Sequence, residues 1–114
     1  MGERKTELRL VDIAEAVARI GTALDGISLD EFEADWQKRW IVERGLEIIS
    51  EASRHLDPDM KARHQEIPWR KVAGIGNILR HAYEKIAADV LWALAQKDLA
   101  ALGKVCEEEL RGQG

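Results

Sequence analysis

Apolar residues recur every three or four positions along most of this chain, the spacing of α-helices that bury one face. The first stripe predicts a helix over about residues 5–25, and it consists of Leu10, Ile13, Val17, Ile20 and Leu24. The chain has only two prolines, and no extended alternation of apolar and polar residues indicates a strand. We therefore predict an all-α fold, an antiparallel bundle of four to five helices joined by short loops.

Turn and capping signals divide this pattern into elements. Gly26 ends the first helix, because glycine tolerates the left-handed backbone found past a helix end. Ser28 and Glu31 form the S-x-x-E capping pattern and predict that a new helix begins there. The next helical stretch, about residues 36–56, is either continuous with that helix or separate from it. It ends before Pro58, because the residue preceding proline disfavours the helical region.

The second half of the chain is less regular. Gly74 and Gly76 are expected to weaken any helix between them, and the helical pattern recovers from Asn77. A break is expected at Lys97–Asp98, and residues 112–114 should fray. No repeat or low-complexity segment is present, so we expect one domain over residues 1–114.

Composition excludes several classes of protein. Cys106 is the only cysteine, so no disulfide forms within the chain, and we interpret it as a structural core residue. No apolar run approaches the roughly 20 residues of a membrane span, and the first residues lack the apolar region of a signal peptide. We therefore expect a cytoplasmic protein without membrane contact. The net charge of −4 argues against coating nucleic acid through bulk charge, but not against a local RNA-binding site.

Nucleotide and metal motifs are also missing. The chain has no glycine-rich phosphate loop, and its three histidines have no metal-ligand spacing. We predict no cofactor and no metal. The four tryptophans are interpreted as core or interface anchors, since not all of them can share one core stripe: Trp36, Trp40, Trp69 and Trp92.

The most informative segment is 67–83, which is basic in an acidic protein. It contains Arg70, Asn77, Arg80, His81 and Tyr83. A histidine titrates near neutral pH, and an arginine beside it can hold a phosphate through two parallel hydrogen bonds. Such a set could bind a phosphodiester, deprotonate a ribose 2′-hydroxyl and stabilise the charge that develops at phosphorus. A basic stretch with one histidine also arises often without any function.

This segment resembles a known family. Its sequence, Ile67-Pro68-Trp69-Arg70, then a glycine-containing turn and Asn77-x-x-x-His81-x-Tyr83, is similar to the HepT-like proteins. This family was long called domain of unknown function 86 and belongs to the HEPN superfamily. The stretch Leu46–Ala52 resembles the family's L-E-I-I-G-E-A, with Ser50 in place of the glycine. The resemblance covers nearly the whole chain.

The resemblance implies an antiparallel helical bundle that forms a homodimer. Family members are ribonuclease toxins of toxin–antitoxin pairs, and the usual antitoxin is a minimal nucleotidyltransferase. In the motif Arg-x(4)-His-x-Tyr, the arginine and histidine act in metal-independent cleavage of RNA such as tRNA or mRNA. The tyrosine can be modified with AMP by the partner, which silences the toxin. By position, the histidine is His81, the tyrosine is Tyr83, and Asn77 follows the arginine position.

One position departs from the family motif. Gly76 stands where the family has arginine, so the nearest substitutes are Arg80 and Arg70. On a helix, Gly76 and His81 are about 140° apart and Arg80 and His81 about 100°, so neither pair shares a face. The first hypothesis is therefore a ribonuclease in which Arg80, with or without Arg70, binds the scissile phosphate. The alternative is a catalytically impaired helical dimer that serves as partner-binding and modification target. In a third reading, His81 is an ordinary polar residue of a structural dimer.

Overall fold

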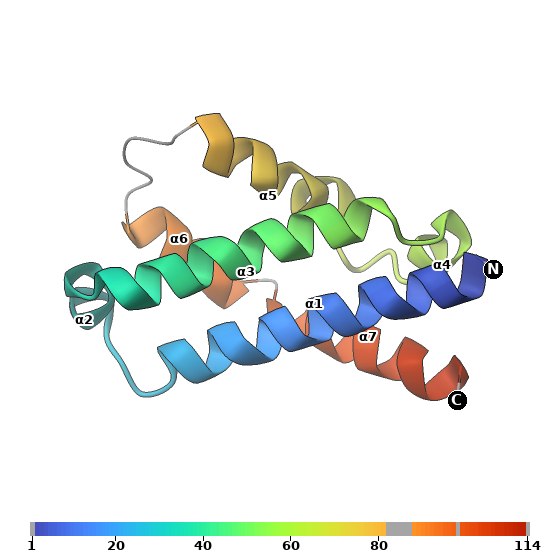
Figure 1. The fold of residues 1–114 in the computed structure, drawn as a ribbon, viewed down its shortest axis with the longest axis horizontal. Helices are drawn as coiled ribbons and strands as arrows, with labels where there is room; N and C mark the ends of the chain where they lie inside the picture. The colour runs from blue at the N-terminus through green and yellow to red at the C-terminus, as the bar shows by residue number, and fades with distance from the viewer. Residues whose placement is uncertain (1, 82–87, 98, 114) are drawn as a thin grey trace.

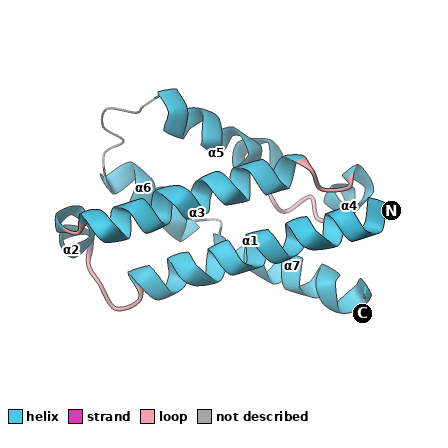
Figure 2. Ribbon diagram, viewed as in Figure 1, coloured by secondary structure: helices cyan, strands magenta, loops and turns pink. Residues whose placement is uncertain are grey.

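The computed structural model describes the backbone of residues 2–81, 88–97 and 99–113, and the side chains of residues 5–80, 88–96 and 99–112. Its described part contains seven helices: α1 (Gly2–Leu24), α2 (Leu29–Ala34), α3 (Trp36–Arg54), α4 (Pro58–Arg63), α5 (Trp69–His81), α6 (Ala88–Lys97) and α7 (Leu99–Gln113). Five of them have ten residues or more, whereas α2 and α4 have six each. The all-α fold is confirmed, and Figure 2 shows helices joined by short loops.

The two longest helices form the centre of the molecule. Helices α1 and α3 lie side by side and antiparallel, α7 packs on α1, and α5 packs on α3 (Figure 1). The molecule measures 43 × 29 × 22 Å and is elongated along these helices. None of the helices in the described ranges is both long and apolar enough to span a membrane.

The apolar stripe of α1 faces the core as predicted. Leu10 and Ile13 are fully buried, Ile20 is almost so, and Val17 is half-buried. They belong to one core with residues from the other helices, including Val42, Leu46, Ile49, Leu91, Leu102 and Cys106. Burial raises the pKa of the Cys106 thiol to about 12, so this cysteine is a neutral core residue at physiological pH.

The predicted helix ends between α1 and α3 are also found. Gly26 adopts the left-handed backbone, with φ of 73°. The Ser28 hydroxyl accepts a hydrogen bond from the Glu31 amide (3.1 Å), and the Ser28 amide donates to the Glu31 carboxylate (3.0 Å). Asp35 then separates α2 from α3, because its carboxylate accepts hydrogen bonds from the first amides of α3. The stretch from 36 is therefore a separate helix.

Gly74 and Gly76 were expected to weaken the helix before Asn77, but the helix there is regular. Helix α5 runs without a break through Gly74 and Gly76. Side chains of α3 make hydrogen bonds to its backbone at Ala73 and Gly76, and this tertiary support outweighs the poor helix propensity of glycine. The break expected near residue 97 is consistent with α6 ending at Lys97 and α7 beginning at Leu99, and α7 continues to Gln113. Fraying of residues 112–114 stays a prediction.

The four tryptophans divide into two kinds. The Trp92 ring packs against Phe32 with ring centroids 5.6 Å apart, and the Trp69 indole donates hydrogen bonds to two backbone carbonyls before α5. These two anchor the fold. Trp36 and Trp40 instead form an edge-to-face pair, with centroids 5.0 Å apart, and expose 54% and 66% of their surface.

Candidate functional site

The sequence-predicted site residues are spread along α5. Arg70, in the first turn, and Asn77 and Arg80 are exposed. Ten positions separate the two arginines, which is about 15 Å along a helix, so they do not act at one point within a single chain. His81 is the last residue of α5, and its side chain lies outside the described part. Tyr83 lies outside the described residues.

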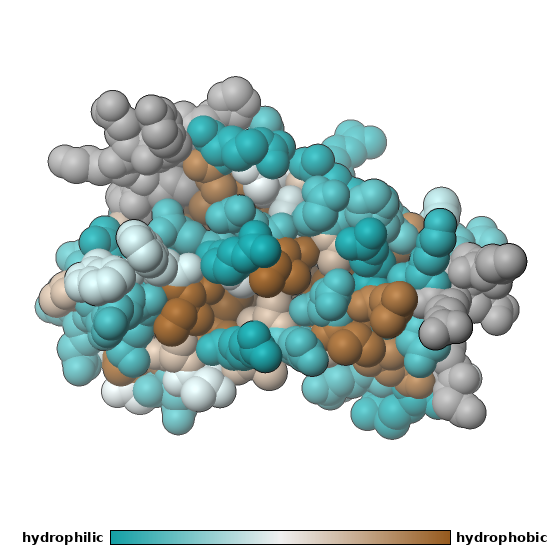
Figure 3. Space-filling model, viewed as in Figure 1, coloured by the Kyte–Doolittle hydropathy of each residue, from teal (hydrophilic) through white to brown (hydrophobic). Residues whose placement is uncertain are grey.

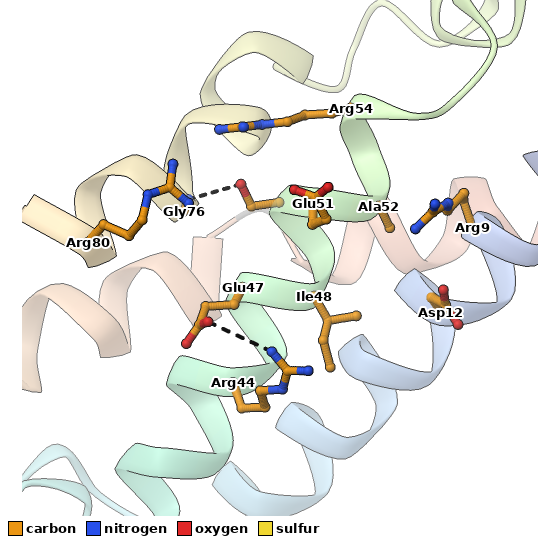
Figure 4. Close-up of a pocket in the computed structure, with 11 residues that line it drawn as sticks. Arg9, Asp12, Arg44, Glu47, Ile48, Glu51, Ala52, Arg54, Gly76 and Arg80 are labelled. Atoms are coloured by element: carbon orange, nitrogen blue, oxygen red, sulfur yellow. Dashed lines mark hydrogen bonds and ion pairs between the residues drawn. The ribbon is translucent and has the colours of Figure 1, made fainter.

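A cleft of about 370 Å³ opens where α1, α3 and α5 meet (Figure 4). Of the predicted residues that are described, Arg80 lines this cleft, whereas Arg70 and Asn77 do not. Helix α1 contributes Arg9 and Asp12, helix α5 contributes Gly76 and Arg80, and the rest of the lining comes from α3: Arg44, Glu47, Ile48, Ser50, Glu51, Ala52 and Arg54. Four arginines thus face three carboxylates, an environment suited to an anionic group.

The Ser50 hydroxyl joins α3 to α5 at the floor of the cleft. It donates a hydrogen bond to the Ala73 carbonyl (2.7 Å) and accepts one from the Gly76 amide (2.9 Å). Ser50 is only 1% exposed; its hydrogen bond with Gly76 is buried and the one with Ala73 is partly buried. Ser50, which stands in place of a glycine of the family stretch, is therefore hydrogen-bonded directly to Gly76, which stands in place of the arginine of the family motif.

The Ser50 side chain explains why position 76 has no side chain. A Cβ atom built on Gly76 would lie 2.9 Å from the Ser50 hydroxyl oxygen, closer than real contacts of this kind. It would also lie 3.6 Å from a terminal nitrogen of Arg80, one turn later on α5. The Arg80 guanidinium therefore reaches back over Gly76, to the place where a side chain of residue 76 would begin (Figure 4).

Arg54 is a cleft residue that sequence reasoning missed. Its guanidinium donates to the Ala73 carbonyl through Nη2 (3.0 Å) and Nε (3.3 Å), and it extends from α3 toward the Gly76 segment (Figure 4). The only sequence signal was its position four residues after Ser50, one helical turn further along α3. Because it is far from segment 67–83 in the chain, its contact with that segment could not be read from local spacing.

Two of the three cleft carboxylates, Glu47 and Glu51, have partners of their own. Glu47 lies 3.8 Å from Arg44, and Glu51 lies 3.0 Å from the ring nitrogen of His55. The hydrogen bond with His55 lowers the pKa of Glu51, which keeps this side chain ionised at neutral pH. Within the described side chains, no carboxylate oxygen comes within 4.0 Å of Arg54 or Arg80, so both remain available to an anionic ligand.

Apolar surface adjoins the cleft. Trp40 and Leu79 border a second hollow together with Arg44 and Arg80, and Ile41 and Ile48 border a third between α1 and α3. Figure 3 shows hydrophobic patches among hydrophilic side chains on the face that these two helices form. Seven large apolar side chains are exposed in the described chain, and five of them belong to α1 and α3: Leu8, Val11, Trp36, Trp40 and Ile41.

The other two histidines lie away from this cleft. The His55 side chain is exposed, whereas the His64 side chain is largely buried although its neighbours in sequence are mostly polar. Its side chain is 14% exposed and lies 2.6 Å from Glu109, which also accepts a hydrogen bond from Arg63 (2.8 Å). This cluster attaches α4 to α7, a contact between distant segments. Nowhere in the described ranges do three histidine, cysteine, aspartate or glutamate side chains gather closely enough to hold a metal ion.

Comparison with known proteins gives consistent matches. A family model described as ribonuclease HepT-like matches residues 13–109. The probable ribonuclease HepT of Thermococcus cleftensis is 40% identical over 93 residues, which cover 82% of this chain and 84% of that protein. A candidate RNase of Methanocaldococcus jannaschii is 33% identical over 107 residues, covering 94% of this chain and 98% of that protein. No solved structure matches the chain.

Proposed function

Because the chain belongs to the ribonuclease HepT-like family, we propose that it is the ribonuclease toxin of a toxin–antitoxin pair and cleaves RNA without a metal ion. The observation that carries this proposal is the position of Arg80. Its guanidinium stands in the arginine-rich cleft over Gly76, and it directly precedes His81 in the chain. Arg80 thereby takes over the role of the arginine that the family motif has at position 76.

In the proposed reaction, His81 removes the proton from a ribose 2′-hydroxyl. The 2′-oxygen then attacks the adjacent phosphorus, the bond to the 5′-oxygen of the next nucleotide breaks, and that oxygen takes up a proton from water while His81 later returns its proton to solvent. The products are a 2′,3′-cyclic phosphate end and a 5′-hydroxyl end. Proton transfer by His81 is general acid–base catalysis, which contributes about 10²–10⁴-fold. Arg80 stabilises the charge that develops on the phosphate oxygens. Asn77 and Arg70 are the further candidate residues on α5.

The proposed active form is a homodimer whose cleft contains two copies of the site. The exposed Trp36–Trp40 pair and the apolar surface of α1 and α3 support this assembly, because isolated soluble chains rarely leave such surface uncovered. A minimal nucleotidyltransferase is the proposed antitoxin, and Tyr83 is the residue that it would modify with AMP. Sedimentation equilibrium of the purified chain tests the dimer, and a monomer at micromolar concentration would contradict it.

The function is tested by incubating the purified, partner-free chain with total tRNA in EDTA. We expect cleavage by the parent and its loss in His81→Ala and Arg80→Ala. Arg111→Ala, which changes an exposed arginine near the end of α7, should cleave as the parent does. Persistent cleavage by the His81 variant would defeat the mechanism. Cleavage that disappears when EDTA is added would defeat metal independence.

A second candidate function is a partner-binding module that no longer cleaves RNA. Gly76 favours it, since the family arginine is missing and the Ser50 hydroxyl fills the space where its side chain would begin. In this case Tyr83 matters more than His81. An inactive parent that is folded, dimeric and unmodified at Tyr83 would favour this candidate. Mass spectrometry of the chain expressed together with its partner would then reveal whether AMP is attached to Tyr83.

A further inference from the structure

Three hydrogen-bond donors converge on one backbone carbonyl of α5. The Ala73 carbonyl accepts from the Ser50 hydroxyl at 2.7 Å and from Nη2 and Nε of Arg54 at 3.0 and 3.3 Å. An exposed arginine ordinarily samples many rotamers, and holding one costs side-chain entropy. Here two donors of the guanidinium are bonded to a carbonyl of the rigid α3–α5 contact. The Arg54 charge is therefore placed in advance at the cleft.

The second cation, Arg80, is placed on the other side of the same contact. Its terminal nitrogen lies over Gly76, whose amide donates to the Ser50 hydroxyl. Ser50 thus lies between the two arginines: it shares the acceptor at Ala73 with Arg54, and it is hydrogen-bonded to Gly76, beside which the Arg80 guanidinium lies. Arg54 comes from α3 and Arg80 from α5, and both extend toward the Gly76 segment in Figure 4.

Two arginines that face one space need an anion. Guanidinium groups repel each other unless a negative group lies near them. Of the cleft carboxylates, Glu47 pairs with Arg44 and Glu51 with His55, and the Arg54 charge also contributes to the lowered pKa of Glu51. The planar guanidinium matches two oxygens of a phosphate, and Arg54 keeps its Nη1 donors free of the bonds to Ala73.

We propose that Arg54 and Arg80 together bind one phosphate group of an RNA strand, with Ser50 as the positioning residue between them. This inference rests on the proposed function and extends it: Arg54, a residue of α3 outside the family motif, is a substrate-binding residue. The ligand is a phosphodiester of single-stranded RNA at the nucleotide that is presented to His81.

The test separates binding from cleavage. A fluorescent single-stranded RNA with 2′-O-methyl groups throughout lacks the attacking hydroxyl, so its affinity can be measured by anisotropy without turnover. We expect Arg54→Gln and Arg80→Gln each to weaken binding about ten- to a hundredfold, as for the loss of a hydrogen bond to a charged group. The double variant should lose much less affinity than the two single fold-losses multiplied together, because both side chains hold one phosphate.

The salt dependence distinguishes a phosphate contact from a structural role. The slope of log affinity against log salt should fall by about 0.7 in Arg54→Gln, as for the loss of one phosphate contact on a single strand. Arg54→Lys, which keeps the charge, should retain the slope, and Arg111→Gln should retain both slope and affinity. Circular dichroism and sedimentation of every variant check that fold and assembly are kept.

Several results would overturn the proposal. One is an Arg54→Gln protein that is folded and binds this RNA with the parent's affinity and slope. Another is an Arg54→Gln protein whose only defect is dissociation into monomers, which would assign Arg54 to a protein interface. A parent that binds the 2′-O-methyl RNA but leaves unmodified RNA intact would defeat the proposed ribonuclease function, and the variants would still decide the phosphate site. A parent that does neither would defeat both.

Discussion

The Ser50–Gly76 contact makes a sharp prediction about protein stability. In Gly76→Ala, the new Cβ would meet the Ser50 hydroxyl oxygen at 2.9 Å and the Ser50 Cβ at 3.5 Å. Ser50 cannot turn away without losing its hydrogen bonds to Ala73 and Gly76, which are 2.7 and 2.9 Å long. In the variant Ser50→Gly the obstacle is absent. The cost of a side chain at position 76 should therefore depend on the residue at position 50.

The magnitudes follow from the same contact. Overpacking together with the weakened hydrogen bonds should cost about 2–4 kcal/mol, and the better helix propensity of alanine returns about 1 kcal/mol. Gly76→Ala alone should thus lower the free energy of unfolding by about 1–3 kcal/mol. Each kcal/mol corresponds to a fall in Tm of roughly 4–8 °C. Added to Ser50→Gly, the same change should cost nothing or stabilise slightly. The coupling between the two positions should be about 2 kcal/mol.

Urea unfolding of the parent, the two single variants and the double variant measures this coupling. Gly74→Ala is the matched control, because it lies on the same helix but a Cβ there meets no atom within 4 Å. It should leave stability unchanged or raise it by up to about 1 kcal/mol. If the two changes prove additive within about 0.5 kcal/mol, the steric explanation of Gly76 is wrong.

Three further predictions concern the rest of the fold. Hydrogen bonds from Arg63 first, and then from His64, lower the pKa of Glu109, so its carboxylate stabilises the fold above the unfolded pKa of about 4.3 and less as pH falls below it. Glu109→Gln should therefore lower the free energy of unfolding by about 1–3 kcal/mol at pH 7, with the gap closing below about pH 4 in a urea series. Cys106, whose pKa is raised to about 12, should not react with iodoacetamide in the native protein at pH 8 but should react in urea, and rapid native labelling would contradict its burial. Trp69→Phe removes an indole that donates to two backbone carbonyls and should lower Tm by several degrees, whereas an unchanged Tm would show that these bonds contribute nothing.

Local sequence patterns predicted much of the fold. The stripe along α1, the capping box at Ser28 and the stop before Pro58 each depend on residues within one or two helical turns. Such signals are complete within the segment that carries them. The glycines of α5 were misinterpreted for the opposite reason, since the bonds that stabilise that helix come from Ser50 and Arg54, more than twenty and nearly twenty residues away.

The candidate site was predicted only in part for the same reason. Arg80 was singled out because it adjoins His81, and it lines the cleft, but its role stays a prediction. Arg54 and the burial of His64 depend on how α3 meets α5 and how α4 meets α7, and no local spacing records these contacts. In the sequence, Ser50 and Gly76 are two separate departures from family patterns. Only the packing of α3 on α5 identifies them as one contact.

The exposed tryptophan pair also gives this protein an optical probe of its own. In the single chain Trp36 and Trp40 are exposed, whereas Trp69 and Trp92 are partly buried, so iodide should quench the fluorescence of the first pair selectively as long as no partner covers it. Trp40 borders the same hollow as Arg80, close enough for its emission to shift toward the blue when a partner or a nucleobase covers it. Assembly and ligand binding can therefore be followed by intrinsic fluorescence, with unlabelled protein and no engineered reporter.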